Sequence, residues 1–177
     1  PQHEPIPEQA SRRLTPGRFI LTRDALGVAE ALADALRAHG VGDIAIIDAD
    51  VLRSESELLQ RCEALQGGGT VAGVVHLATL GSAELAATGT PAQWREALQV
   101  NEKSFFLLLR ELGGLLAEDG HVVAVSGLGG LFGREGSSSG VLRMESGALG
   151  AVKSLREERP RLRVRAVDVE PARDAVE

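Results

Sequence analysis

A serine and a glycine-rich loop follow the most uniformly apolar short stretch of the chain. Residues Val122 to Val125 form an unbroken apolar run of mostly β-branched side chains. Such a run is typical of a strand buried on both faces of a parallel sheet. Ser126 comes next, followed by glycines at positions 127, 129, 130 and 133. Ligands and catalytic groups of open α/β sheets collect at the carboxyl ends of strands, so we expect any chemistry of this protein to show here.

The turn after the first apolar run is where a dinucleotide would bind in such a sheet. A dinucleotide site needs a glycine-rich turn, because the backbone at the helix N-terminus must approach a pyrophosphate. Gly27 is the one glycine within residues 22–29, and Asp24 puts a carboxylate near the position of the anion. Asp48 stands about 20 residues further on, where a ribose-binding acid would lie. A single acid is weak support, so we expect no bound cofactor, with Gly27 and Asp48 as vestiges of such a site.

Other residue types that could do chemistry stand alone in the sequence. The single cysteine, Cys62, lies within a predicted helix and excludes an internal disulfide and a cysteine-based zinc cluster. Asp48 and Asp50 could form a metal pair, but no third ligand lies within sequence range, so we expect no metal. His76 ends an apolar run, and we expect a buried histidine with satisfied hydrogen bonds rather than a base.

Five apolar runs alternate with amphipathic stretches and predict the elements that position these residues. The predicted strands cover residues 18–22, 44–47, 71–77, 122–125 and 162–169. The predicted helices cover residues 24–39, 54–65, 90–117 and 141–158. We expect Thr22 or Asp24 to cap the first helix, and Leu26 to lie on its buried side.

Strands that alternate with helices of this length predict a parallel sheet covered on both faces. Right-handed crossovers restrict such a sheet to a doubly wound arrangement. We therefore expect an α/β fold, a truncated Rossmann-like doubly wound parallel sheet of about five strands in the order 2-1-3-4-5.

The last predicted strand has two different sides. Alternation puts Leu162, Val164 and Ala166 on one side and the arginines at positions 161, 163 and 165 on the other. We expect an edge strand whose apolar side packs under a helix. We expect its basic side to be exposed to solvent or to contact acidic groups. Charges of this kind protect an edge strand from self-association.

Length and composition indicate one globular domain. The chain has 177 residues and a net charge of -6, which argues weakly against nucleic acid as a partner. No apolar run approaches the roughly 18 residues of a membrane span, so we expect a soluble, cytoplasmic protein without membrane contact. We expect residues 1–16 to be a linker or extended arm, residues 17–171 the domain, and residues 172–177 the start of a connection to a following domain.

Several stretches together resemble the short-chain dehydrogenase/reductase family. They are Val71–Ala78, Trp94 with Leu98–Asn101, Gly120–Ser126 and Val164–Asp168, and their order and spacing carry the resemblance. The resemblance points most to the ketoreductase regions of modular polyketide synthases and polyunsaturated-fatty-acid synthases. In that family, a ketoreductase consists of two Rossmann-like halves. The catalytic half binds NADPH, and a truncated structural half precedes and supports it.

The sequence departs from the active family at the catalytic positions. The resemblance places Ser126 at the first of the usual paired serines and Gly127 at the second, catalytic one. The tyrosine position falls near residue 140 or 141, and the lysine position near residue 144 or 145. The chain contains no tyrosine, so the family's general acid is missing. Asn101 matches the family's asparagine, or the lysine of its polyketide variants, but has no tyrosine to serve. We expect it to bond backbone across the sheet.

These departures favour a non-catalytic structural subdomain of a megasynthase ketoreductase, with Asn101 and Ser126 as vestigial positions. Such a subdomain would support a separate half that binds NADPH and reduces β-ketoacyl thioesters on a carrier protein. Its implied partners are that catalytic half of the same polypeptide and other synthase domains, including the acyl carrier protein. Two alternatives stay open: an NAD(P)-dependent short-chain reductase or a fragment of one, and a flavodoxin-like binding module.

Overall fold

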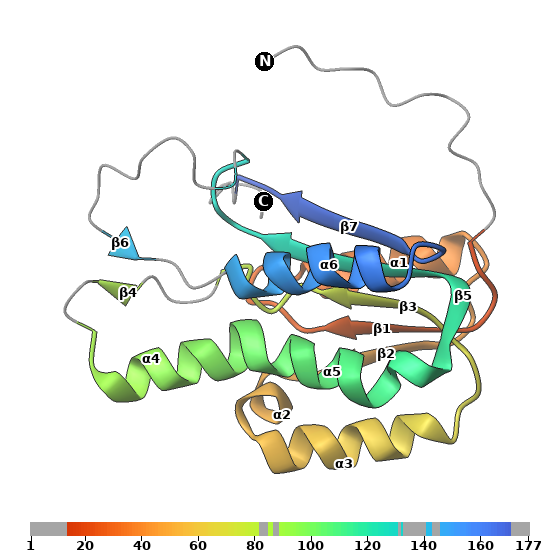
Figure 1. Cartoon of the computed structure of the whole chain (residues 1–177), viewed down its shortest axis with the longest axis horizontal. Coiled ribbons are helices and arrows are strands. Elements are labelled where there is room, and N and C mark those ends of the chain that lie inside the picture. The colour runs from red at the N-terminus through yellow and green to blue at the C-terminus, as the bar shows by residue number, and fades with distance from the viewer. Residues whose placement is uncertain are drawn as a thin grey trace.

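A parallel sheet with helices on both faces forms the centre of the computed structural model (Figure 1). The structure describes residues 14–81, 85–86, 89–130, 132, 141–142 and 146–170. Most of the expected arm at residues 1–16, and all of the expected connection at residues 172–177, lie outside these ranges. Within them, Thr15 is buried and its hydroxyl donates to the carbonyl of Asp119 at 3.1 Å.

The five strands of the main sheet are the five that apolar periodicity predicts. They are β1 (Arg18–Thr22), β2 (Ile44–Ile47), β3 (Val71–His76), β5 (Leu116–Ser126) and β7 (Arg163–Asp168). Every neighbouring pair is parallel. The spatial order is β2-β1-β3-β5-β7, which confirms the predicted order 2-1-3-4-5. All residues of β3 are buried, as a central strand of a parallel sheet requires.

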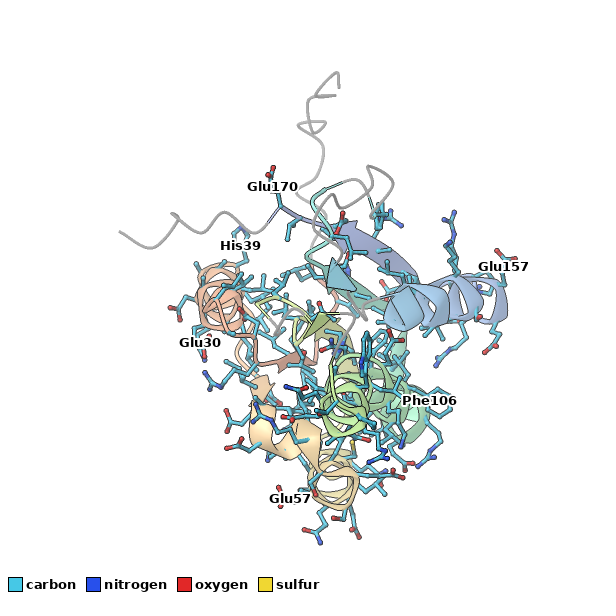
Figure 2. All side chains as sticks on the ribbon, turned by 90° about the vertical axis from the view of Figure 1, so that its left-hand side faces the viewer. Glu30, His39, Glu57, Phe106, Glu157 and Glu170 are labelled. Carbon is cyan, nitrogen blue, oxygen red and sulfur yellow. The ribbon has the colours of Figure 1, made fainter. Side chains whose placement is uncertain are left out.

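The helices divide unequally between the two faces of the sheet. One face holds α2 (Ala49–Arg53), α3 (Glu55–Gln66), α5 (Ser104–Leu112) and α6 (Ser146–Glu158), whose apolar side chains join one large core cluster. On the opposite face, α1 (Val28–Ala38) packs on β1 and β3 in a second, smaller cluster (Figure 2). No described helix is long and apolar enough to cross a membrane.

The helix expected over residues 90–117 is interrupted twice. Thr90 and Gln93 form a capping box at the start of α4 (Pro91–Leu98), as the Thr-Pro sequence predicts. A π-helical turn, Gln99–Lys103, connects α4 to α5. The last turn is the 3-10 turn Gly113–Leu115, because consecutive glycines are poor helix formers. β5 therefore begins at Leu116, six residues before the predicted strand, and Leu116 pairs with Val71 of β3.

Two further boundaries differ from the prediction. Residues 141–142, expected to begin the last helix, form the short strand β6 (Val141–Leu142), which pairs antiparallel with β4 (Leu85–Ala86). The helix α6 begins at Ser146 instead. The Glu102 carboxylate accepts from the backbone N–H of Gly147 at 2.9 Å, which holds this helix start against the π-helical turn.

Candidate functional site

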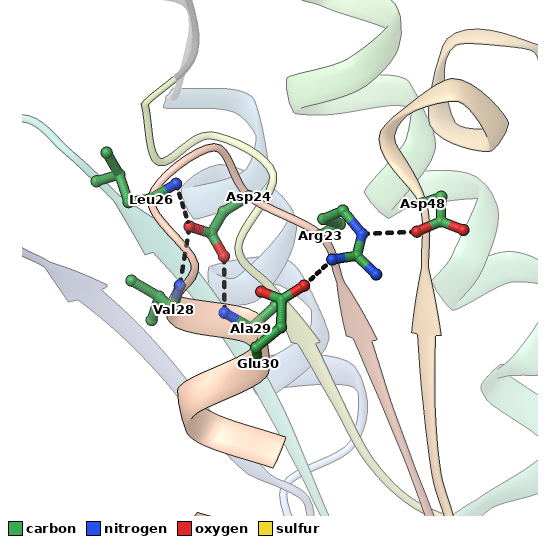
Figure 3. A network of polar contacts seen from close by, with 7 residues as sticks. All are labelled: Arg23, Asp24, Leu26, Val28, Ala29, Glu30 and Asp48. Carbon is green, nitrogen blue, oxygen red and sulfur yellow. Dashed lines mark hydrogen bonds and ion pairs between the residues drawn. The ribbon is translucent and has the colours of Figure 1, made fainter. Parts of the chain in front are cut away.

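The carboxylate of Asp24 closes the N-terminus of α1, at the turn where a dinucleotide would bind. Its Oδ1 accepts from the backbone N–H of Leu26 at 2.7 Å and of Val28 at 3.1 Å, and its Oδ2 accepts from Ala29 at 2.7 Å (Figure 3). The amides of Val28 and Ala29 belong to the first turn of α1, where a helix N-terminus can bind a phosphate. The carboxylate of Asp24 therefore binds amides that could otherwise bind an anion. This is the place that the sequence analysis predicted for it.

Gly27 allows this closure and shifts the start of the helix. Its φ is 79°, in the left-handed region that glycine favours, and it directly precedes α1. The helix begins at Val28, later than expected, and Asp24 satisfies its amides from outside. Leu26 consequently lies before the helix and is 40% exposed, which corrects its expected place on the buried side.

Asp48, the other residue expected to be a vestige of a cofactor site, forms an ion pair with an arginine. Its Oδ1 accepts from Nε of Arg23 at 2.6 Å, and Arg23 also pairs with Glu30 of α1 (Figure 3). Arg23 thereby links the first turn to the end of β2. Asp50 pairs separately with Arg53, and no group of three potential metal ligands occurs among the described residues.

His76 lies at the carboxyl end of β3 and is completely buried. Its Nε2 lies 3.0 Å from the backbone carbonyl of Asn101, and its Nδ1 lies 3.2 Å from the hydroxyl of Thr22. The ring stacks on Phe105 with centroids 4.9 Å apart. Both ring nitrogens are therefore engaged within the fold, which matches the expected buried, satisfied histidine.

The hydrogen-bond directions around His76 follow from its partners. A carbonyl can only accept, so Nε2 carries the ring proton and donates to Asn101. Nδ1 then accepts from the Thr22 hydroxyl, whose oxygen in turn accepts from the backbone N–H groups of Leu77 at 2.8 Å and Ala78 at 3.0 Å. Burial lowers the pKa of His76 to about 4, so the ring is neutral at pH 7.

Asn101 sits in the π-helical turn and is 3% exposed. We expected Asn101 to bond backbone across the sheet, but the bond observed joins its own backbone carbonyl to the side chain of His76. The side-chain Oδ1 has no hydrogen-bond partner within the described residues. The backbone carbonyl that accepts from His76 therefore belongs to the π-helical turn.

Ser126, expected to be a vestigial catalytic position, is buried at the end of β5. Its hydroxyl donates to Oδ1 of Asp168 at 2.6 Å. The same carboxylate accepts from the backbone N–H of Leu128 at 2.7 Å and of Phe132 at 2.7 Å. The loop after β5 is thus held by an acid from the end of β7, and the Ser126 hydroxyl is engaged in that structure.

The described polar groups at this end of the sheet form separate closed networks. Ser126 bonds to Asp168, whereas Asn101 bonds to His76, so no serine–histidine pair is formed. Burial, with a smaller contribution from Glu111, raises the pKa of the Cys62 thiol to about 11, so it is not a thiolate nucleophile at pH 7. The arrangement holds the loops at this end of the sheet in place.

Sequence reasoning missed two residues that organise this end of the sheet. Asp168 was noted only as the last residue of a resembling segment, and Thr22 only as a helix cap. Each is a polar residue that ends a strand of the main sheet, as Ser126 does. Polar residues at the carboxyl ends of parallel strands would have been the signal for both.

Known structures share this fold, although no family model and no curated protein matches the sequence. A small-chain dehydrogenase matches with a TM-score of 0.70 at 13% identity, over 87% of this chain and 82% of the other. A small-chain dehydrogenase in complex with NADPH gives 0.65 at 12% identity, over 86% and 69%. A short-chain dehydrogenase/reductase from Serratia marcescens gives 0.68 at 17% identity, over 87% and 78%. The fold is therefore that of short-chain dehydrogenases/reductases.

Proposed function

We propose that this chain is a non-catalytic, structural subdomain of a ketoreductase in a polyketide or polyunsaturated-fatty-acid synthase. The observation that carries the proposal is the closed N-terminus of α1. Three backbone amides that could bind a cofactor phosphate instead bind the Asp24 carboxylate. A phosphate at this position would have to displace a like-charged group that already has good hydrogen bonds.

The catalytic positions support the same proposal. The chain contains no tyrosine to protonate a carbonyl oxygen. The hydroxyl of Ser126 is buried and bonded to Asp168, and both nitrogens of His76 are engaged. A subdomain of this kind contributes a packed sheet rather than a reacting group. In the proposed arrangement, NADPH binds to a separate catalytic half of the same polypeptide, which reduces β-ketoacyl thioesters on an acyl carrier protein.

The proposal also includes the organisation of the chain. Residues 17–171 would be the truncated Rossmann-like domain, preceded by an arm at residues 1–16 and followed by a connection at residues 172–177. An NAD(P)-dependent short-chain reductase is the second candidate. The fold likeness to a small-chain dehydrogenase in complex with NADPH favours it.

Cofactor binding and turnover distinguish the two candidates. The purified chain is titrated with NADPH while cofactor fluorescence is recorded, and the oxidation of NADPH is then followed with a β-ketoacyl thioester. A short-chain reductase that binds NADPH serves as the positive control. We expect no saturable fluorescence change and no oxidation above the rate without protein. A dissociation constant in the micromolar range, or measurable turnover, would contradict the structural role and favour the reductase.

A further inference from the structure

The π-helical turn between α4 and α5 joins the end of β3 to the start of α6. It lies where α4 passes into α5, beside α6 (Figure 1). The backbone carbonyl of Asn101 accepts from Nε2 of His76 at 3.0 Å. The carboxylate of Glu102 accepts from the backbone N–H of Gly147 at 2.9 Å. Asn101 and Glu102 are consecutive residues, so neighbouring positions of one turn hold two different elements of the fold.

The start of α6 is shaped to receive the Glu102 carboxylate. A Cβ on residue 147 would collide with that carboxylate, so a glycine is what allows it to lie against the helix. Gly147 belongs to the first turn of α6, where a backbone N–H has no acceptor within the helix. Glu102 therefore supplies a hydrogen bond that α6 cannot supply itself, and it places a negative charge at the positive end of the helix.

The turn is also held to the packed body of the protein at two points. Its first residue, Gln99, donates from Nε2 to the backbone carbonyl of Leu52 in α2 at 3.2 Å. The bond between His76 and Asn101 is buried, because His76 is completely buried and Asn101 is 3% exposed. Loss of a donor in such surroundings leaves a buried carbonyl without a partner, which is costly. The turn is thus fixed at its start and in its middle.

The number of residues per turn differs between a π-helix and an α-helix, so this segment has two possible windings. Hydrogen bonds of a π-helix join residues five apart, and those of an α-helix join residues four apart. A change to α-helical winding rotates the residues on one side of the turn by about 100° relative to those on the other. Asn101 and Glu102 both lie within the turn, so a change in its winding moves both residues together.

We propose that the π-helical turn is a coupling element, in which the hydrogen bond between His76 and Asn101 maintains the winding that lets Glu102 cap α6. The turn is then a two-state element that both contacts bias. A disturbance at the end of β3 loosens the first turn of α6 without unfolding the sheet. This helix begins shortly after residues 140 and 141, where the resemblance places the family's tyrosine. The coupling is independent of the proposed function, because it involves only hydrogen bonds within this chain.

Hydrogen exchange of the Gly147 amide, measured by NMR on the whole chain, reports on the cap directly. We expect Glu102→Ala to accelerate this exchange at least about tenfold, because a hydrogen bond to a charged acceptor is lost. His76→Phe keeps an aromatic ring but has no donor for Asn101, and it should accelerate the same amide at least about threefold. The double variant should exchange no faster than Glu102→Ala alone, because both substitutions act on the same bond.

Gln99→Ala tests the coupling without a change in the sheet. It removes the tether of the turn to Leu52 and should also accelerate exchange of Gly147, by at least about twofold. Gln66→Ala is the matched control, because it removes a bond from a glutamine side chain to the backbone carbonyl of Glu111, outside the turn. The control should leave exchange of Gly147 unchanged.

The amide of Val122 in β5 separates a local effect from loosening of the whole fold. Acceleration of Gly147 with Val122 unchanged supports the coupling. An unchanged Gly147 rate in His76→Phe would overturn it, because Glu102 would then cap α6 whatever the state of the bond to Asn101. If His76→Phe accelerates both amides alike, the sheet itself has loosened and Gln99→Ala decides. An unchanged Gly147 rate in Gln99→Ala would then overturn the coupling.

Discussion

Asp24 and Asp168 both accept hydrogen bonds from loops at the same end of the sheet, but their partners lie at very different distances along the chain. Within the described residues, each carboxylate accepts three hydrogen bonds. The partners of Asp24 lie two, four and five residues away along the chain. Those of Asp168 lie 36 to 42 residues away, across the pairing of β5 with β7. The hydrogen bonds of Asp24 form within one turn, whereas those of Asp168 require that β5 and β7 have paired.

This difference shows two ways in which carboxylates of the chain hold loops at the carboxyl end of the sheet. A local carboxylate satisfies the helix N-terminus before any tertiary contact is needed. A distant carboxylate satisfies the loop after β5 and simultaneously ties together two strands. His76 lies between them and joins β1, β3 and the π-helical turn through neutral hydrogen bonds. The hydrogen bonds of Asp24, Asp168 and His76 can therefore be disrupted separately, each by a different change.

Acid is expected to have the largest effect, and it acts on His76. The folded pKa of about 4 lies below the ordinary value of 6.5, so the unfolded chain binds a proton in this window that the folded chain does not. The free energy of unfolding is therefore highest above pH 6.5 and falls by about 3 kcal/mol as the pH approaches 4. His121, whose pKa is also lowered, contributes in the same direction.

Urea unfolding at several pH values measures this loss, and His76→Gln isolates it. The variant lacks the titrating ring, so its free energy of unfolding should depend less steeply on pH between 6.5 and 4. Equal slopes for the two proteins would show that the ring is not buried in its neutral form. Carboxylates titrate in both proteins, so their contribution cancels in the difference.

Removal of the distant carboxylate comes second. Asp168→Ala leaves the buried hydroxyl of Ser126 and the amide of Leu128 without their acceptor, so we expect a loss of about 2 kcal/mol in urea unfolding. The companion Asp168→Ala/Ser126→Ala removes both partners of one bond and should recover part of that loss. A loss below about 0.5 kcal/mol, the usual limit for surface substitutions, would show that Asp168 does not hold the loop.

Removal of the local carboxylate should cost less. Asp24→Ala removes the cap of α1, for which we expect a loss of about 1 kcal/mol, and Asp24→Asn should restore most of it. Hydrogen exchange should accelerate in the first turn of α1 and stay unchanged in β5 and β7. Acceleration in those strands would mean that the closure is not local.

The smallest effect is the coupling between the two carboxylates. Among the described residues they share no partner, so the losses of Asp24→Ala and Asp168→Ala should add within about 0.5 kcal/mol in the double variant. A double-mutant cycle in urea provides the measurement. A larger coupling would show that the two loops form one cooperative unit and would remove the distinction between them.

Much of the architecture was predictable because it depends on local pattern. The apolar runs place all five main strands, and short connections restrict their order. Thr90 with Pro91 marks a helix start without knowledge of the rest of the fold. The error at residues 113–117 has a tertiary cause as well as a local one. The apolar pattern continues through Leu115, and pairing of Leu116 with Val71 decides that the chain turns into a strand.

By itself, the sequence determined the fold class, the closed first turn and the absence of a tyrosine. These follow from periodicity, from one glycine and one acid a few residues apart, and from composition, none of which needs a distant contact. Only the tertiary structure decided that Asp168 holds Ser126 and that the Asn101 carbonyl accepts from His76. Each of these depends on segments far apart in the chain, whose meeting is set by sheet register and crossover packing rather than by any local preference.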